Sequence, residues 1–139
     1  MVATQIRVLV VDDSAKFRNV VRQLLTSEED IAVVGEAGDG AAALVKIREV
    51  TPDVVLMDCS MPGMGGVEAT RLIRGRHPRI HVIGLSNEEQ GREFQEMRAA
   101  GAEAVIPKAA GPQEIGDAIR TSATSQFPAG GANQERRSQ

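Results

Sequence analysis

The chain has 139 residues, enough for one domain with a substantial hydrophobic core. Its net charge of −3 is small, no block of basic residues is present, and its apolar runs are too short to span a bilayer, so we expect neither nucleic-acid nor membrane contact. The N-terminus lacks a signal-peptide pattern and Cys59 is the only cysteine, so we expect a cytoplasmic protein without an internal disulfide.

Short aliphatic runs alternate along the chain with segments whose apolar residues repeat every three to four positions. The first kind is typical of buried strands and the second of helices that bury one face. Ser14 and Asp39 are candidate helix N-caps, Pro112 suits a first helical turn, and Gly101 suits a C-cap. In chain order we expect strand 6–11, a helix after Ser14, strand 31–37, helix 39–49, strand 53–58, helix 66–77, strand 80–86, helix 88–101, strand 102–107 and helix 112–120.

This alternation contains no hairpin signal. It predicts an α/β fold, a doubly wound five-stranded parallel sheet with helices on both faces. From residue 121 onward the chain is polar and small, without an apolar period, which is typical of a flexible tail. We therefore expect one folded domain over residues 1–121 and a flexible C-terminal tail over 122–139.

Polar side chains stand where the predicted strands end: Asp12 and Asp13 after the first, Asp58 on the third, Ser86 on the fourth and Lys108 after the fifth. Ligands of open parallel α/β sheets bind at this edge. Clustered carboxylates repel unless a cation joins them, and Mg²⁺ prefers oxygen ligands shared with phosphate. The pattern predicts phosphate chemistry, with Asp58 as nucleophile, Ser86 as hydrogen-bond donor and Lys108 as phosphate-binding cation.

Each of these residues also has a plain explanation when taken alone. Adjacent aspartates are common in solvated turns, Ser86 could cap a helix, and Lys108 could be a surface lysine. It is their convergence on one edge of the sheet that favours a site. Cys59 is more typical of a small buried packing residue, and we expect His77 and His81 at the surface or in loops.

Four motifs together resemble the receiver domain of two-component response regulators, over roughly residues 5 to 121. They occur in the family's order and spacing: VVDD at 10–13, DVVLMDCSMPGMGG at 53–66, which contains D-x-x-M-P-x-x-x-G, IGLS at 83–86, and IPK at 106–108. The segment from 106 to 120 is similar to receivers of LuxR-type regulators. The resemblance implies a flavodoxin-like (βα)5 fold with strand order 2-1-3-4-5.

The resemblance also implies roles for individual residues. Asp58 would be the phosphoacceptor, Ser86 the switch hydroxyl and Lys108 the phosphate contact. Mg²⁺ would be bound by Asp12, Asp13, Asp58 and the backbone carbonyl of Ser60. A histidine kinase or phosphotransfer protein would donate the phosphoryl group. Phosphorylation would then alter a face that regulates a protein partner, and a homodimer is left open. Such a protein is not an enzyme, beyond catalysing its own phosphorylation and dephosphorylation.

Two features depart from the family pattern. Val105 occupies a position that is often Tyr or Phe, so an aromatic switch cannot report phosphorylation. LuxR-type regulators carry a helix-turn-helix domain after the receiver, whereas this sequence stops at residue 139, and we expect a stand-alone receiver.

Two other functions, and one competing motif, fit parts of the sequence. A phosphatase with an aspartate nucleophile needs a second acid two residues later, where this chain has Ser60. A receiver-shaped interaction module that takes no phosphate would not need so many of the required groups. The GDGAAA stretch at 38–43 fits a dinucleotide-binding pattern, but it follows the second strand rather than the first, so a turn and a capped helix explain it better.

Overall fold

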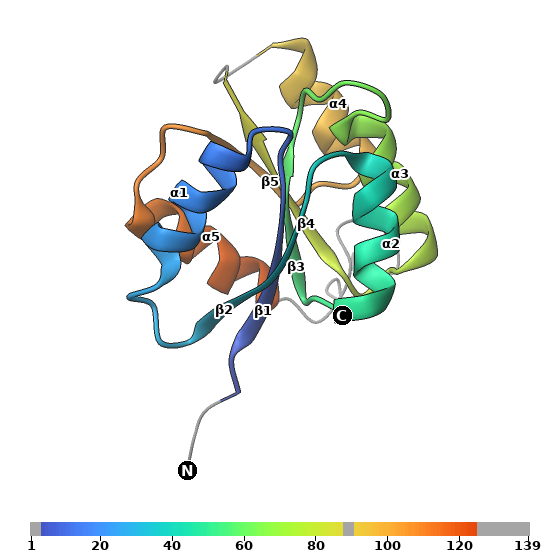
Figure 1. Ribbon diagram of the computed structural model, residues 1–139. Coiled ribbons are helices and arrows are strands. Elements are labelled where there is room, and N and C mark those ends of the chain that lie inside the picture. Colours follow the sequence, from blue (N-terminus) through green and yellow to red (C-terminus); the bar gives the residue numbers. More distant parts are fainter. Residues whose placement is uncertain (1–3, 88–90, 125–139) are drawn as a thin grey trace, which may run out of the picture.

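The computed structural model describes residues 4–87 and 91–124 (Figure 1). Its five parallel strands form one sheet in the order β2-β1-β3-β4-β5, which confirms the predicted fold class and strand order. The strands are β1 (Ile6–Val11), β2 (Ile31–Ala37), β3 (Val54–Asp58), β4 (His81–Ser86) and β5 (Ala104–Pro107). The helices are α1 (Ala15–Leu25), α2 (Gly40–Val50), α3 (Gly66–Arg76), α4 (Arg92–Ala100) and α5 (Pro112–Ala123).

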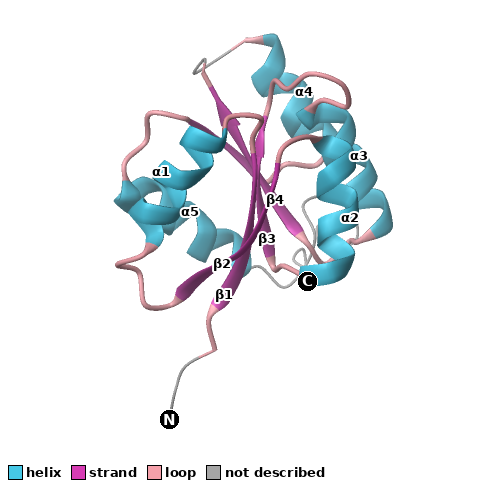
Figure 2. Cartoon of the chain, in the orientation of Figure 1, coloured by secondary structure: helices cyan, strands magenta, loops and turns pink. Residues whose placement is uncertain are grey.

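Helices cover both faces of the sheet, α1 and α5 on one and α2, α3 and α4 on the other (Figure 2). The alternation of side chains along a strand produces two separate cores. In β1, Val8 and Val10 pack with α1 and α5, whereas Leu9 and Val11 pack with α2, α3 and α4. The segments 8–11 of β1 and 54–57 of β3 are apolar because both faces of the sheet are buried there.

The predicted helix ends are confirmed where the capping geometry is visible. The Ser14 hydroxyl accepts a hydrogen bond from the Phe17 amide at 3.1 Å, and the Asp39 carboxylate accepts one from the Ala42 amide at 2.7 Å. Gly101 ends α4 with a φ of 118°, in the left-handed region that favours glycine.

Several boundaries differ from the prediction. Helix α4 begins at Arg92 within the described residues, and positions 88–90 of the predicted helix lie outside them. Helix α5 continues to Ala123, past the predicted end at residue 120, because Ser122 is buried and Ala123 packs against the core. Most of the predicted tail, from residue 125 onward, lies outside the described residues.

The expected placement of His81 is wrong. It lies in β4 with 7% of its surface exposed, and its Nδ1 contacts Oε2 of Glu103. The sequence shows a polar residue at the start of a strand but not the carboxylate that makes its burial tolerable. Cys59 is buried as expected, and burial raises the pKa of its thiol to about 12, so the thiol stays protonated at neutral pH.

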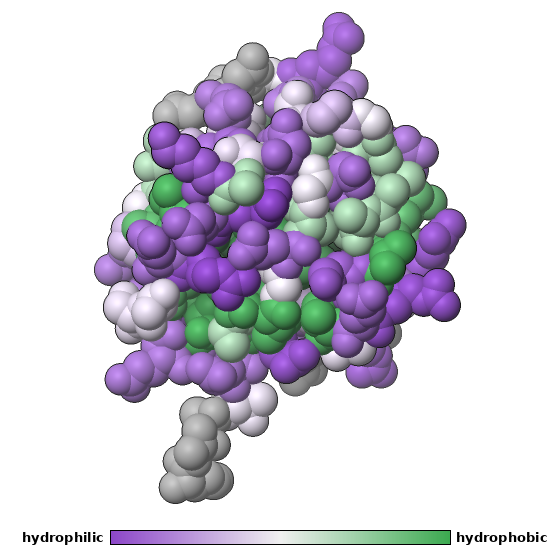
Figure 3. Space-filling model, in the orientation of Figure 1, coloured by the Kyte–Doolittle hydropathy of each residue, from purple (hydrophilic) through white to green (hydrophobic). Residues whose placement is uncertain are grey.

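The face of the molecule seen in Figure 3 is mostly hydrophilic, with small hydrophobic areas between polar side chains. The large hydrophobic residues that are exposed in the described part are Val20 and Val45. Over the same part of the chain, every helix is too short or too polar to cross a membrane.

Candidate functional site

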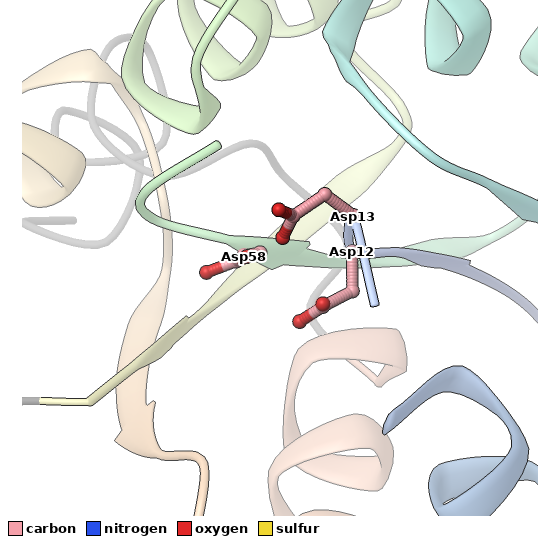
Figure 4. Close-up of side chains that lie close together, drawn as sticks. All are labelled: Asp12, Asp13 and Asp58. Carbon is pink, nitrogen blue, oxygen red and sulfur yellow. The ribbon is translucent and has the colours of Figure 1, made fainter. Parts of the chain in front are cut away.

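The ends of β1 and β3 lie side by side at the point where the strand order of the sheet reverses. Strand β1 has β2 on one side and β3 on the other, which is the arrangement that opens a crevice at the carboxyl edge. Oxygens of Asp12, Asp13 and Asp58 lie within 4.8 Å of one another there. The three carboxylates extend to the same side of the strand ends (Figure 4). The structure thus brings together the acids that the sequence singled out.

Asp12 is fully buried and firmly oriented. Its backbone amide donates to the carbonyl of Ala37 in β2 at 3.1 Å, and its Oδ1 accepts from the Ser14 amide at 2.8 Å. Oδ2 lacks a hydrogen bond of ordinary geometry in the described structure and faces the Lys108 ammonium at 2.6 Å. The Lys108 ammonium is thus the positive charge that lies against this buried oxygen.

Asp58 has 2% of its surface exposed. Burial raises the pKa of its carboxyl to about 6, and the charges of Asp12 and Asp13 act in the same direction. Two contacts oppose the rise: the Ser60 amide donates to Oδ1 at 3.2 Å, and the Lys108 ammonium lies 3.6 Å from Oδ2. The carboxyl of Asp58 therefore takes up a proton at a higher pH than an exposed aspartate does, although these two contacts favour the ionised form.

Lys108, which follows β5, supplies the positive charge next to these acids. Burial alone would lower the pKa of its ammonium, but contacts with Asp12 and Asp58 outweigh that effect and raise it. The ammonium also lies 4.5 Å from the centre of the Phe17 ring, a cation–π contact. The lysine is thus charged and partly enclosed beside the acids.

The two serines of the predicted site differ in their surroundings. Ser86 is buried at the end of β4, and its carbonyl accepts a hydrogen bond from the Lys108 amide at 2.8 Å, which links the loops after β4 and β5. Ser60 is exposed, and its amide contacts Asp58. That its carbonyl is a metal ligand stays a prediction.

The donor set suits a hard divalent cation. Two of the three carboxylates are buried, and burial together with the charges of Asp12 and Asp13 raises the pKa of Asp58 even though Lys108 is nearby. A group of carboxylate oxygens that includes the exposed Asp13 matches the preference of Mg²⁺ for oxygen ligands.

The sequence did not indicate that Phe17 and Arg18 adjoin the site. In the sequence Phe17 is only an apolar residue of the helix after Ser14, yet its ring covers Lys108. Arg18 donates from Nη1 to the carbonyl oxygen of Asp12 at 2.6 Å. Both follow the Ser14 cap by about one helical turn, and this spacing is the signal that could have placed them beside Asp12.

Residues 8–120 match the family model of the response regulator receiver domain. The chain belongs to this family. The response regulator GacA of Pseudomonas viridiflava is 44% identical over 115 residues, which are 83% of this chain and 54% of that protein. A protein-glutamate methylesterase/protein-glutamine glutaminase of Nocardioides is 42% identical over 113 residues, 80% of this chain and 31% of that protein. The receiver therefore spans about half the length of GacA and a third of the methylesterase.

Among solved structures, the receiver domain of the response regulator NarL from Mycobacterium tuberculosis is similar, with a TM-score of 0.83 and 33% identity. The match covers 89% of this chain and all of that one (100%). Receiver domains of response regulators act in phosphorylation-dependent signalling and are not enzymes in the usual sense. The shared region of the methylesterase is this receiver part.

Proposed function

We propose that this receiver is a switch that accepts a phosphoryl group on Asp58 from a histidine kinase or phosphotransfer protein. The observation that supports this most directly is the cluster of Asp12, Asp13 and Asp58 within 4.8 Å at the carboxyl edge of the sheet. Of the three, Asp58 combines burial with a raised pKa and a nearby ammonium, the setting expected of a carboxylate nucleophile.

We assign the metal ligands to Asp12, Asp13, Asp58 and the backbone carbonyl of Ser60, and the metal to Mg²⁺. Bound there, Mg²⁺ supplies charge neutralisation and orientation for the transferring phosphoryl group. The support is the oxygen-only donor set, in which the buried carboxylates of Asp12 and Asp58 share the ammonium of Lys108.

The transfer itself is assigned to the side chain of Asp58. One ionised carboxylate oxygen attacks the phosphorus of a phosphohistidine, the bond from phosphorus to nitrogen breaks, and its electron pair stays on the leaving imidazole. Lys108 lies 2.6 Å from Asp12 Oδ2 and 3.6 Å from Asp58 Oδ2, close enough to shift toward the new phosphoryl oxygens and stabilise their charge.

The response to phosphorylation is assigned to Ser86 and Lys108. In the phosphorylated state the Ser86 hydroxyl would donate to a phosphoryl oxygen, which favours a conformation with its loop drawn inward. The hydrogen bond from the Lys108 amide to the Ser86 carbonyl would carry this shift to β5. Because Val105 is not aromatic, the change would reach a protein partner through these loops and the adjoining helices rather than through a ring flip.

The test is incubation of the full chain with acetyl phosphate and Mg²⁺, followed by intact-mass measurement. We expect the mass gain of one phosphoryl group in the wild type and none in Asp58→Ala. Asp53→Asn is the matched control, because Asp53 is an exposed aspartate just before the other end of β3 and should leave the gain unchanged.

Other results would contradict the proposal. No mass gain in the wild type would favour a receiver-shaped module that takes no phosphate. Turnover of many phosphomonoesters would favour a phosphatase. A gain that persists in Asp58→Ala would move the phosphoacceptor to another residue.

A further inference from the structure

Arg18 joins three elements of the fold at the edge of the site. Its side chain, 19% exposed, extends from α1 and donates from Nε to Oε1 of Glu36 in β2 at 2.9 Å. From Nη1 it donates to the carbonyl oxygen of Asp12, just after β1, at 2.6 Å. One guanidinium thus connects a β2 side chain to the backbone of the first acid of the site.

The carbonyl of Asp12 needs such a donor because the residue lies just past the end of its strand. Its amide still bonds to Ala37 in β2, and its side chain contacts Ser14 and Lys108. A partly buried carbonyl left without a donor is unfavourable. With Arg18 in place, both the peptide group and the side chain of Asp12 are oriented, and the carboxylate stays directed toward Asp58.

The positive charge of Arg18 would by itself oppose a cation at the acidic cluster. Glu36 offsets that charge, because its carboxylate lies directly against the guanidinium. Arg18 therefore acts on Asp12 as an oriented hydrogen-bond donor more than as a competing charge.

We infer that Arg18 is a positioning residue for Asp12, which raises the affinity of the acidic cluster for Mg²⁺. The inference rests on the proposed function, because it takes these acids to be metal ligands.

Arg22 offers a matched control one turn further along α1. It donates from Nε to Oε2 of Glu36 at 2.9 Å, so it shares the same carboxylate. Its side chain is 43% exposed, and no contact joins it to Asp12 in the described structure. Arg18→Met and Arg22→Met each remove one guanidinium from Glu36 and keep an apolar stem, but only the first deprives the Asp12 carbonyl of its donor.

Two measurements on the full chain separate these variants. Calorimetric titration with Mg²⁺ gives the dissociation constant, and amide exchange followed by NMR in metal-free protein reports the backbone at Asp13 and Ser14. We expect Arg18→Met to weaken Mg²⁺ binding about tenfold and to speed exchange at both amides. Arg22→Met should leave both quantities unchanged, although it also loses an ion pair.

Equal Mg²⁺ affinity in the two methionine variants would overturn the inference. The proposed function would still stand if the wild type binds Mg²⁺ and Asp12→Asn does not, whereas a wild type that fails to bind Mg²⁺ would overturn both. Arg18→Gln, whose shorter side chain cannot reach both Glu36 and Asp12, repeats the test if Arg18→Met does not fold; unchanged Mg²⁺ affinity in it counts against the inference as well.

Discussion

At the scale of single residues, the buried charge of Asp58 lowers the stability of the fold. A buried carboxylate beside two further acids is unfavourable in the absence of a cation, which the raised pKa of about 6 expresses. Under the proposed function, the same arrangement would make the side chain reactive and favour metal binding. We therefore expect the metal-free protein to become more stable when this charge is removed.

The first prediction concerns the pH dependence of that effect. The folded state binds the Asp58 proton more tightly than the unfolded state, where the pKa is near 3.8. The free energy by which this proton stabilises the folded state is therefore present in full below pH 3.8, and it is lost as the pH rises through about 6. The loss is about 3 kcal/mol by linkage. Asp58→Asn, which carries no charge, should be more stable than the wild type at pH 8 by an amount of that order, and the difference should vanish near pH 4.

Urea denaturation in the presence of a chelator, repeated across this pH range, measures the difference. Addition of Mg²⁺ at pH 8 should stabilise the wild type and not Asp58→Asn, since the charge it would bind is missing. If the free energy of unfolding varied with pH in the same way in both proteins, the charge of Asp58 would not be the cause of the pH dependence.

At the scale of elements, the start of α3 packs directly on the end of β3. A Cβ atom on Gly66 would lie 2.0 Å from the carbonyl oxygen of Asp58 and 3.0 Å from Cα of Cys59. Both are backbone atoms, so no rotamer change could relieve the overlap. The final glycine of D-x-x-M-P-x-x-x-G is thus required by the close approach of this helix to the end of β3.

The second prediction follows from this contact. Gly66→Ala should destabilise the fold by about 3 kcal/mol or more, because the helix must move away from β3. Gly75→Ala in the same helix, where nothing lies within 4 Å of the added atom, should instead stabilise it by roughly 0.5–1 kcal/mol. Urea denaturation of both variants is the measurement, and equal effects would show that the space at Gly66 is not the limiting factor.

At the scale of the whole molecule, α5 contacts a segment that precedes it in the chain by about ninety residues. Arg120 contacts Glu28 and, at 2.7 Å, Asp30, both in the segment between α1 and β2. Ser122 is buried, and Ala123 packs against the core that α5 shares with α1. The last turn of α5 is therefore part of the folded domain, whereas the sequence predicts a domain end at residue 121.

The third prediction tests that boundary. A chain ending at residue 124 should have the melting temperature and the Mg²⁺ dependence of the full chain. A chain ending at residue 121 should melt at a lower temperature, because it lacks Ser122 and Ala123. Equal melting temperatures for the two shortened chains would show that the domain ends at residue 121. A melting temperature below that of the full chain for the chain ending at residue 124 would show that the tail contributes to the fold.

The sequence by itself determined the elements and the acids of the site, because both depend on local patterns. Apolar periodicity and capping residues such as Ser14 and Asp39 act within one helical turn. Asp12, Asp13 and Asp58 could be grouped without a structure because parallel strands end at a common edge. The roles of these residues came from the family resemblance and stay predictions.

Only the tertiary structure decided which charged side chains meet. The contacts of Arg18 with Glu36, of His81 with Glu103, and of Arg120 with Glu28 and Asp30 join elements whose separation in the chain carries no local signal. The stretch SEED at 27–30 reads as a solvated helix end, and it becomes a binding partner for α5 only once the helices pack on the sheet. A charged residue is compatible with many neighbours, and packing selects among them.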